Sequence, residues 1–155
     1  MMLAACGGSA NGKNTSMTAK EFQNLIKESE KDIENAYMQA NTDADVTIVF
    51  DIRDPEEEDD YTESKFFMMS QDDAGESEMI FMGYLHEFDD EKLAQSEYEL
   101  KCFDESKADE KDYQITYDTE SGSVFGIDGT STFEILSYQT GNEAVIDDIL
   151  EEMGY

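Results

Sequence analysis

The sequence has few cationic side chains: it contains 10 Lys and Arg against 39 Asp and Glu, which gives a formal net charge of −29 at pH 7. Nucleic acids are held mainly by Lys and Arg, and so acidic a field repels their phosphates. We therefore expect no nucleic-acid partner. The same charge favours cations, basic peptides or proteins and neutral glycans as partners, although an acidic surface can also serve solubility alone.

The residues of common catalytic centres are also scarce. His86 is the single histidine, and no GxSxG, GxGxxG, phosphate-loop, CxxC or HExxH pattern occurs in the sequence. Carboxylates are so numerous that a pair suited to acid–base chemistry carries no information. We expect no enzyme activity and no cofactor, and we interpret His86 as an ordinary, partly buried residue.

Long apolar runs and paired cysteines are missing as well. No internal stretch approaches the ~20 apolar residues of a membrane span, so we expect the domain to lie outside the bilayer. The two cysteines are Cys6 and Cys102. Cys102 falls on the apolar side of an alternating run, which is typical of a small buried residue.

The start of the chain carries the clearest motif. Leu3-Ala4-Ala5-Cys6 is an apolar residue, two small residues and a cysteine, and it precedes the Gly/Ser/Asn-rich run Gly7-Gly8-Ser9-Ala10-Asn11-Gly12. This pattern resembles the lipobox of bacterial lipoproteins. The resemblance implies that Cys6 carries a diacylglyceryl group and becomes the mature N-terminus. The domain would then be held on the outer face of the cell membrane by this lipid anchor.

The rest of the sequence divides around this motif. We expect residues 1–5 to be the remnant of a signal peptide whose earlier part lies upstream. Residues 6–17 would be the lipidated cysteine and a flexible linker. Residues 18–155, with their many Phe, Tyr and Met, are enough for a single acidic domain with a real core.

Helical spacing appears at both ends of this domain. Thr18 and Glu21 form a capping box, and the apolar stripe that begins at Phe22 predicts an amphipathic helix over about 18–40. A short final helix is predicted after Asn142, with Gly154 as its stop. Between them we expect strands at 46–52, 65–69, 78–86, 97–102, 113–117, 123–127 and 132–138.

Short connections without strand–helix–strand alternation indicate an α+β fold. We expect the first helix to pack on a curved, mostly antiparallel sheet of six or seven strands, in an arrangement that broadly resembles cystatin-like and pilin-head folds. Residues 78–86 have apolar side chains on both faces, which predicts a central strand. The turn before the strand at 123–127 needs Gly122 for a positive φ.

Acidic loops raise a second possibility, because hard cations such as calcium take carboxylate oxygens. The EF-hand spacing is absent, and runs of like charge are typical of solvated loops. The weak candidate ligands are Asp54, Asp59, Asp60, Asp72, Asp73, Asp89 and Asp90.

The aromatic residues raise a third possibility. Five of them do not fit one inward face, and exposed together they would form a docking surface for a protein: Tyr61, Phe66, Phe67, Phe88 and Phe103. Alternatively, the first and last helices each cover one face of the sheet. Our main hypothesis is a lipid-anchored, non-catalytic binding or accessory domain of the cell envelope. The alternatives are a calcium-binding surface protein and, least favoured, a small envelope hydrolase.

Overall fold

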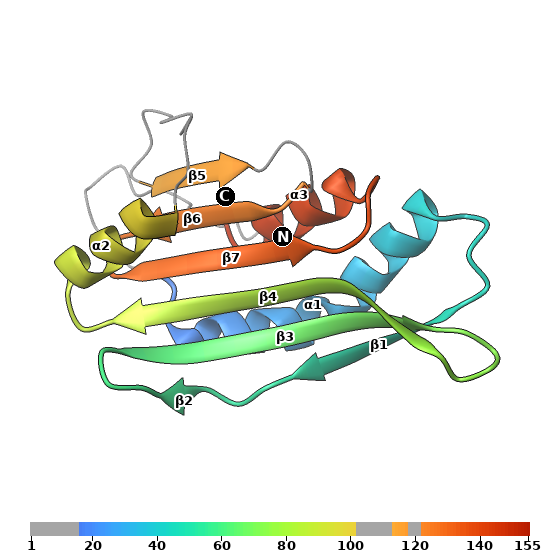
Figure 1. Ribbon diagram of the computed structural model, residues 1–155, viewed down its shortest axis with the longest axis horizontal. Helices are drawn as coiled ribbons and strands as arrows, with labels where there is room; N and C mark the ends of the chain where they lie inside the picture. Colours follow the sequence, from blue (N-terminus) through green and yellow to red (C-terminus); the bar gives the residue numbers. More distant parts are fainter. Residues whose placement is uncertain (1–15, 102–112, 118–121) are drawn as a thin grey trace, which may run out of the picture.

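The structure, a computed structural model, describes residues 16–101, 113–117 and 122–155. In this part of the chain, helices pack on both faces of one sheet (Figure 1). The elements in chain order are α1 (Ala19–Ala40), β1 (Thr47–Ile52), β2 (Glu56–Glu57), β3 (Tyr61–Gln71), β4 (Ser77–Phe88), α2 (Glu91–Lys101), β5 (Tyr113–Tyr117), β6 (Val124–Asp128), β7 (Ser131–Ser137) and α3 (Glu143–Glu152). The predicted α+β class is confirmed.

The first helix begins where the sequence predicts. The Thr18 hydroxyl accepts from the Glu21 amide at 3.1 Å, and the Glu21 carboxylate accepts from the Thr18 amide at 2.8 Å. This capping box satisfies amides that the first helical turn leaves without partners. The stripe that follows is buried, with Phe22, Ile26 and Ile33 at 1 % exposure or less.

The described strands form one antiparallel sheet with the order β1-β3-β4-β7-β6-β5, and the short β2 pairs with β3. The two longest strands are β3 and β4. Since β4 is paired on both sides, with β3 and with β7, the central strand predicted over 78–86 is confirmed. The predicted hairpin is also present, because Tyr113 pairs with Asp128 and Tyr117 with Val124. Gly122 has a φ of 75°, as its turn requires.

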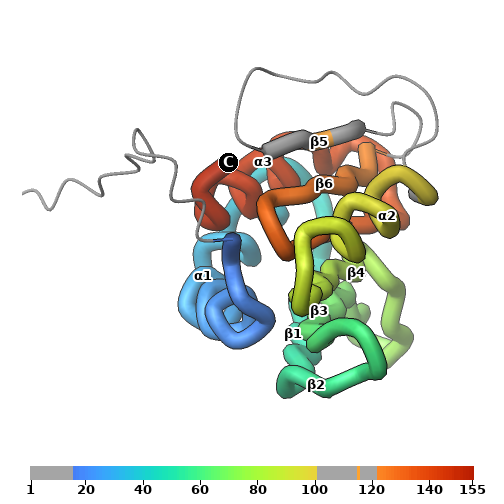
Figure 2. The backbone as a smooth tube through the Cα atoms, turned by 90° about the vertical axis from the view of Figure 1, so that its left-hand side faces the viewer, coloured from blue at the N-terminus to red at the C-terminus, as the bar shows by residue number. Residues whose placement is uncertain are grey.

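Both terminal helices cover the same face of the sheet, which we name the back face. Figure 2 shows α1 and α3 on one side and α2 on the other. Phe22 and Ile26 of α1 share one core with Ile146 and Ile149 of α3. The expectation that the first and last helices cover opposite faces is therefore wrong. Sequence periodicity shows which stripe of a helix is apolar, but not which side of a sheet it meets.

Two glycines allow aromatic rings to lie close to the backbone of this core. Gly83 of β4 pairs with Phe66, and Gly126 of β6 pairs with Phe133. A Cβ atom at Gly83 would lie 2.1 Å from the Phe66 ring, and one at Gly126 would lie 2.2 Å from the Phe133 ring. Both phenylalanines are fully buried because these two strand positions have no side chain.

The second helix corrects a prediction. The alternation of Tyr98, Leu100 and Cys102 indicated a strand over 97–102, but residues 91–101 are helical. Ala94 and Tyr98, four residues apart, are buried against the sheet, whereas Leu100 is 78 % exposed. Residues four apart lie on the same side of a helix, and this helical spacing of the buried side chains is the one that the structure follows. The alternation of apolar residues over 97–102 does not reflect a strand. Cys102 lies outside the described residues.

The helix α2 covers only part of the second face, which we name the front face. It lies over β4, β6 and β7 and forms a small apolar cluster with Phe88, Phe125 and Ile127. The front sides of β1 and most of β3 have no described helix over them (Figure 1). None of the described helices is both long and apolar enough to cross a membrane.

Candidate functional site

His86 is the centre of the most chemically distinctive cluster on the front face. Its side chain is held between two carboxylates, with Nδ1 at 2.8 Å from Glu97 Oε1 and Nε2 at 2.9 Å from Glu63 Oε2. Glu63 reaches the ring from β3, where it is paired directly with His86 of β4. Glu97 reaches it from α2, and the Thr132 hydroxyl also donates to Glu97 Oε1, at 3.2 Å.

The faces of the imidazole ring are covered as well. Tyr61 stacks on it with ring centroids 4.1 Å apart, and Tyr84 with centroids 4.7 Å apart. Phe88 meets the ring edge-on. His86 is consequently 7 % exposed. The prediction that it is a partly buried residue underestimated its burial.

Lys65 is also part of this cluster, because its ammonium group is hydrogen-bonded to Glu63 Oε1. Burial alone would raise the pKa of Glu63, but hydrogen bonds from Lys65 and His86, with their positive charges, outweigh it and lower that pKa. The bond to Glu63 in turn raises the pKa of Lys65. Both oxygens of Glu63 are thus occupied by neighbouring side chains.

These bonds define what His86 can do. Each ring nitrogen is bonded to a carboxylate, Nε2 to Glu63 and Nδ1 to Glu97. Because the ring is also buried, neither nitrogen faces solvent. The geometry supports a structural role, in which the hydrogen bonds of His86 connect α2 to β3 and β4.

A second carboxylate on the front face has the opposite character. Burial raises the pKa of Glu134 on β7, and the Tyr84 hydroxyl donates to its Oε2. Carboxylates with oppositely shifted pKa values are typical of acid–base pairs. Here, however, both oxygens of Glu63 are already bonded, one to Lys65 and one to His86. We therefore base no catalytic step on Glu63 and Glu134.

The candidate cation ligands lie in separate loops. Within the residues that the structure describes, no group of three or more His, Cys, Asp or Glu side chains is arranged to hold a metal ion. Asp54 accepts from Gln23 Nε2 at 2.6 Å, Asp72 from the amides of Ala74 and Glu76, and Asp90 from the amide of Lys92. The other candidates are exposed: Asp59, Asp60, Asp73 and Asp89.

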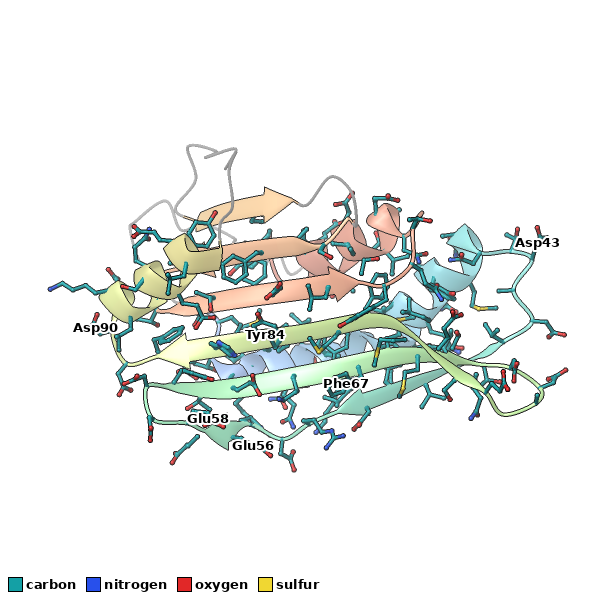
Figure 3. All side chains as sticks on the ribbon, viewed as in Figure 1. Asp43, Glu56, Glu58, Phe67, Tyr84 and Asp90 are labelled. Carbon is teal, nitrogen blue, oxygen red and sulfur yellow. The ribbon has the colours of Figure 1, made fainter. Side chains whose placement is uncertain are left out.

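Two of these loops meet at one end of the sheet. Tyr61 pairs with Phe88, so Asp59 and Asp60 just before β3 lie near Asp89 and Asp90 just after β4. Figure 3 shows Asp90 and Glu58 at this end. Another acidic group lines a groove of about 410 Å³ between α1 and α3, where Ser29 donates to Glu152 at 3.3 Å. Acidity alone defines no ligand in either place.

The predicted aromatic docking surface does not exist in the expected form. Phe66 is fully buried in the back-face core, and Phe88 is 7 % exposed beneath α2. Tyr61 and Phe67 are half-buried on the front face, and Phe103 lies outside the described residues. The strict alternation of β3 sends Phe66 and Phe67 to opposite faces.

A different apolar surface remains on the front face beyond α2. Asp51, Phe67, Met82 and Leu136 form one row across four strands, and Val49 and Met69 belong to the next row. Val49 is 37 % exposed; the other apolar side chains are half-buried. Figure 3 shows Phe67 on the face opposite α1. We name Val49, Phe67, Met69, Met82 and Leu136 the open strip.

Charged residues border the open strip. Arg53 lies over the Phe67 ring, with its guanidinium carbon 5.8 Å from the centroid, and donates to Asp51 at 2.6 Å. The open strip therefore combines apolar side chains with a polar margin, as protein-binding surfaces do. Sequence reasoning missed it because the pairing of β1, β3, β4 and β7 had to be known first.

The Cys6 site has no structural description, because residues 1–15 lie outside the described residues. The comparisons with known proteins add no functional assignment: no family model, no curated protein and no solved structure matches the chain.

Proposed function

We propose that this protein is a lipid-anchored domain on the outer face of the cell membrane, where it binds another protein without catalysing a reaction. The location is supported by Leu3-Ala4-Ala5-Cys6 and the small, polar residues after it. Of the linker predicted over residues 6–17, Ser16 and Met17 are hydrogen-bonded to Thr130 and Ser131 of the domain. A lipid on Cys6 and the linker residues before Ser16 would leave the folded domain free to meet partners near the membrane surface.

The binding role rests on one observation, the open strip. Its five side chains come from β1, β3, β4 and β7, and no described helix covers β1 and most of β3 on this side. Methionine is prominent here, and its unbranched, polarisable side chain suits adaptable contact surfaces. An apolar area of this kind on an otherwise highly charged protein is typical of an interaction site.

The net charge of the domain indicates which kind of partner it can bind. With a formal net charge of −29, it repels acidic proteins and a second copy of itself. We therefore propose a partner that presents basic residues around an apolar contact. His86 has a separate role, because it fixes α2 over the remaining part of the front face.

The anchor is tested by expression in a bacterium with a complete secretory signal placed before Leu3. The Cys6 protein should fractionate with membranes, and mass spectrometry should find a lipidated N-terminal cysteine. The matched Cys6→Ser variant should be released. Equal solubility of the two proteins would contradict the anchor.

The binding surface is tested by photocrosslinking in intact cells. A photoreactive amino acid at Val49 or Met82, in the open strip, should give one dominant adduct. The same group at Asn24, an exposed position on α1, should not. Adducts of equal yield at all three positions would contradict the open strip as the binding site.

A further inference from the structure

The edge strand β1 offers a second kind of contact, formed by the backbone. It is the outermost of the long strands at its end of the sheet and pairs through all six residues with β3. Within the described part of the chain, no strand lies on its other side (Figure 1). An edge of this kind can template the addition of another strand.

The direction of each backbone group follows from the register. The Arg53 amide donates to the Lys65 carbonyl at 2.9 Å, immediately after the pair of Ile52 with Phe66. In an antiparallel ladder such bonded pairs alternate, so Val49 and Asp51 also bond to β3. The amides and carbonyls of the alternate residues then point away from the sheet: Ile48, Phe50 and Ile52.

The side chains of β1 show that both faces of the sheet are incompletely buried at this edge. Ile48, Phe50 and Ile52 pack against the back-face core but remain half-buried. Val49, on the front face, is 37 % exposed. A strand added beside β1 would extend both apolar rows and cover all four side chains.

The charged residues around β1 indicate which kind of strand would bind beside it. Between residues 43 and 60 Arg53 is the single cation, whereas the acidic residues are Asp43, Asp45, Asp51, Asp54, Glu56, Glu57, Glu58, Asp59 and Asp60. Figure 3 shows Asp43 beyond one end of β1, with Glu56 and Glu58 beyond the other. Pairing of β1 with the β1 strand of a second copy would bring two such acidic edges together, which charge repulsion disfavours.

We propose that β1 is a strand-addition site for an extended, basic segment of a partner protein, in which apolar residues alternate with Lys or Arg. The added strand bonds to the outward amides and carbonyls of Ile48, Phe50 and Ile52. Its apolar side chains continue the back-face row, and its cations meet the acidic flanks. This inference rests on the proposed binding role but does not require the lipid anchor.

The test uses the full chain with the Cys6→Ser substitution and a capped eight-residue peptide of alternating valine and lysine. A peptide of equal charge with two valines replaced by proline is the control, because proline cannot donate to a ladder. Binding is followed by isothermal titration, and backbone amide exchange by NMR. The valine–lysine peptide should protect the amides of Ile48, Phe50 and Ile52, with little change at Val49 and Asp51.

A pair of variants locates the contact. Val49→Lys places a cation on the edge and should weaken binding of the valine–lysine peptide by about tenfold or more. Leu93→Lys adds the same charge at a similar exposure of 38 %, on α2, and should leave the affinity within about twofold. Circular dichroism should show that both variants are folded.

The outcomes separate this inference from the proposed function. Equal binding of the two peptides would overturn strand addition, because charge attraction alone would then explain it. Peptide-induced changes in the methyl signals of Met69 and Met82 without amide protection in β1 would also overturn strand addition, while the open strip would remain the binding site. No binding, together with no crosslinks at Val49 and Met82, would contradict both.

Discussion

The two faces of the sheet are built from different chemistry. The back face is closed by α1 and α3 over a large apolar core, in which Phe22, Phe66 and Phe133 are at 1 % exposure or less. The front face is covered in part by α2, over a smaller cluster. Its buried groups include the imidazole of His86, hydrogen-bonded to Glu63 and Glu97.

This difference separates stability from interaction. Apolar burial is non-directional and dominates folding, so the back face should supply most of the free energy of unfolding. The polar network under α2 gains less, because each buried hydrogen bond replaces one to water. Substitutions on the back face should therefore cost the most, and α2 should be the most easily opened of the described helices.

The largest effect is expected from Phe22→Ala on α1. Phe22 is buried in the back-face core and its ring centroid lies 6.1 Å from that of Phe66. Truncation removes apolar contacts and leaves a cavity, at a cost of about 3–5 kcal/mol. Urea denaturation measures the loss. A cost below about 1 kcal/mol would contradict the claim that the back face supplies most of the stability.

The next effect concerns the close contact beneath Phe66. Gly83→Ala would force the added Cβ and the ring apart and should destabilise the protein by about 1–3 kcal/mol. In the Phe66→Leu background the same substitution should cost less, because a smaller side chain can move aside. Four denaturation curves form this double-mutant cycle. Equal costs in both backgrounds would show that the contact does not restrict the core.

His86→Phe tests the polar network on the front face. The ring keeps its stacking position between Tyr61 and Tyr84, but Glu63 and Glu97 lose a donor, at a cost of about 1–3 kcal/mol. Addition of Glu97→Gln should recover part of this loss, because an uncharged amide is less costly to bury. Thermal unfolding measures both. If Glu97→Gln restores no stability, the cost of His86→Phe arises from altered packing and not from the lost hydrogen bonds.

The smallest effects, below about 1 kcal/mol, are the opposite pH dependences of two carboxylates. The lowered pKa of Glu63 gives stability above the ordinary carboxyl pKa, which is lost as the pH falls through the lowered value. The raised pKa of Glu134 penalises the folded state at high pH, and the penalty disappears as the pH falls.

Two variants separate these contributions. At neutral pH Glu63→Gln should lose stability and Glu134→Gln should gain it, and both differences should shrink below the ordinary carboxyl pKa. Denaturant midpoints from pH 3 to pH 8 measure them. Shifts of the same sign in both variants would contradict the assigned environments.

Much of the fold could be predicted from local signals. The capping box at Thr18, the stripe that starts at Phe22, the hairpin at Gly122 and the stop at Gly154, whose φ is 91°, are all present. Asn142 stands at the start of α3 as predicted, but its side chain does not cap the helix. Its Oδ1 accepts instead from Asn41 Nδ2 at 2.8 Å.

What could not be predicted depends on contacts between distant residues. Glu63 meets His86 because β3 and β4 pair in one particular register, and no local pattern determines that register. Glu97 reaches the same ring from a helix in a segment that the sequence indicated as a strand. The positions of α1 and α3 on one face, and therefore the open strip on the other, required the three-dimensional arrangement.

The contrast between the two faces is tested most directly by native-state hydrogen exchange of the backbone amides in α1 and α2. If α2 is held mainly by its small cluster and by Glu97, its Ala94 and Tyr98 amides should exchange through local opening. That opening should be at least about tenfold more frequent than for Ile26 and Ile33 of α1, or ~1.4 kcal/mol less costly. Equal opening free energies in both helices would contradict a molecule with one closed face and one face that opens.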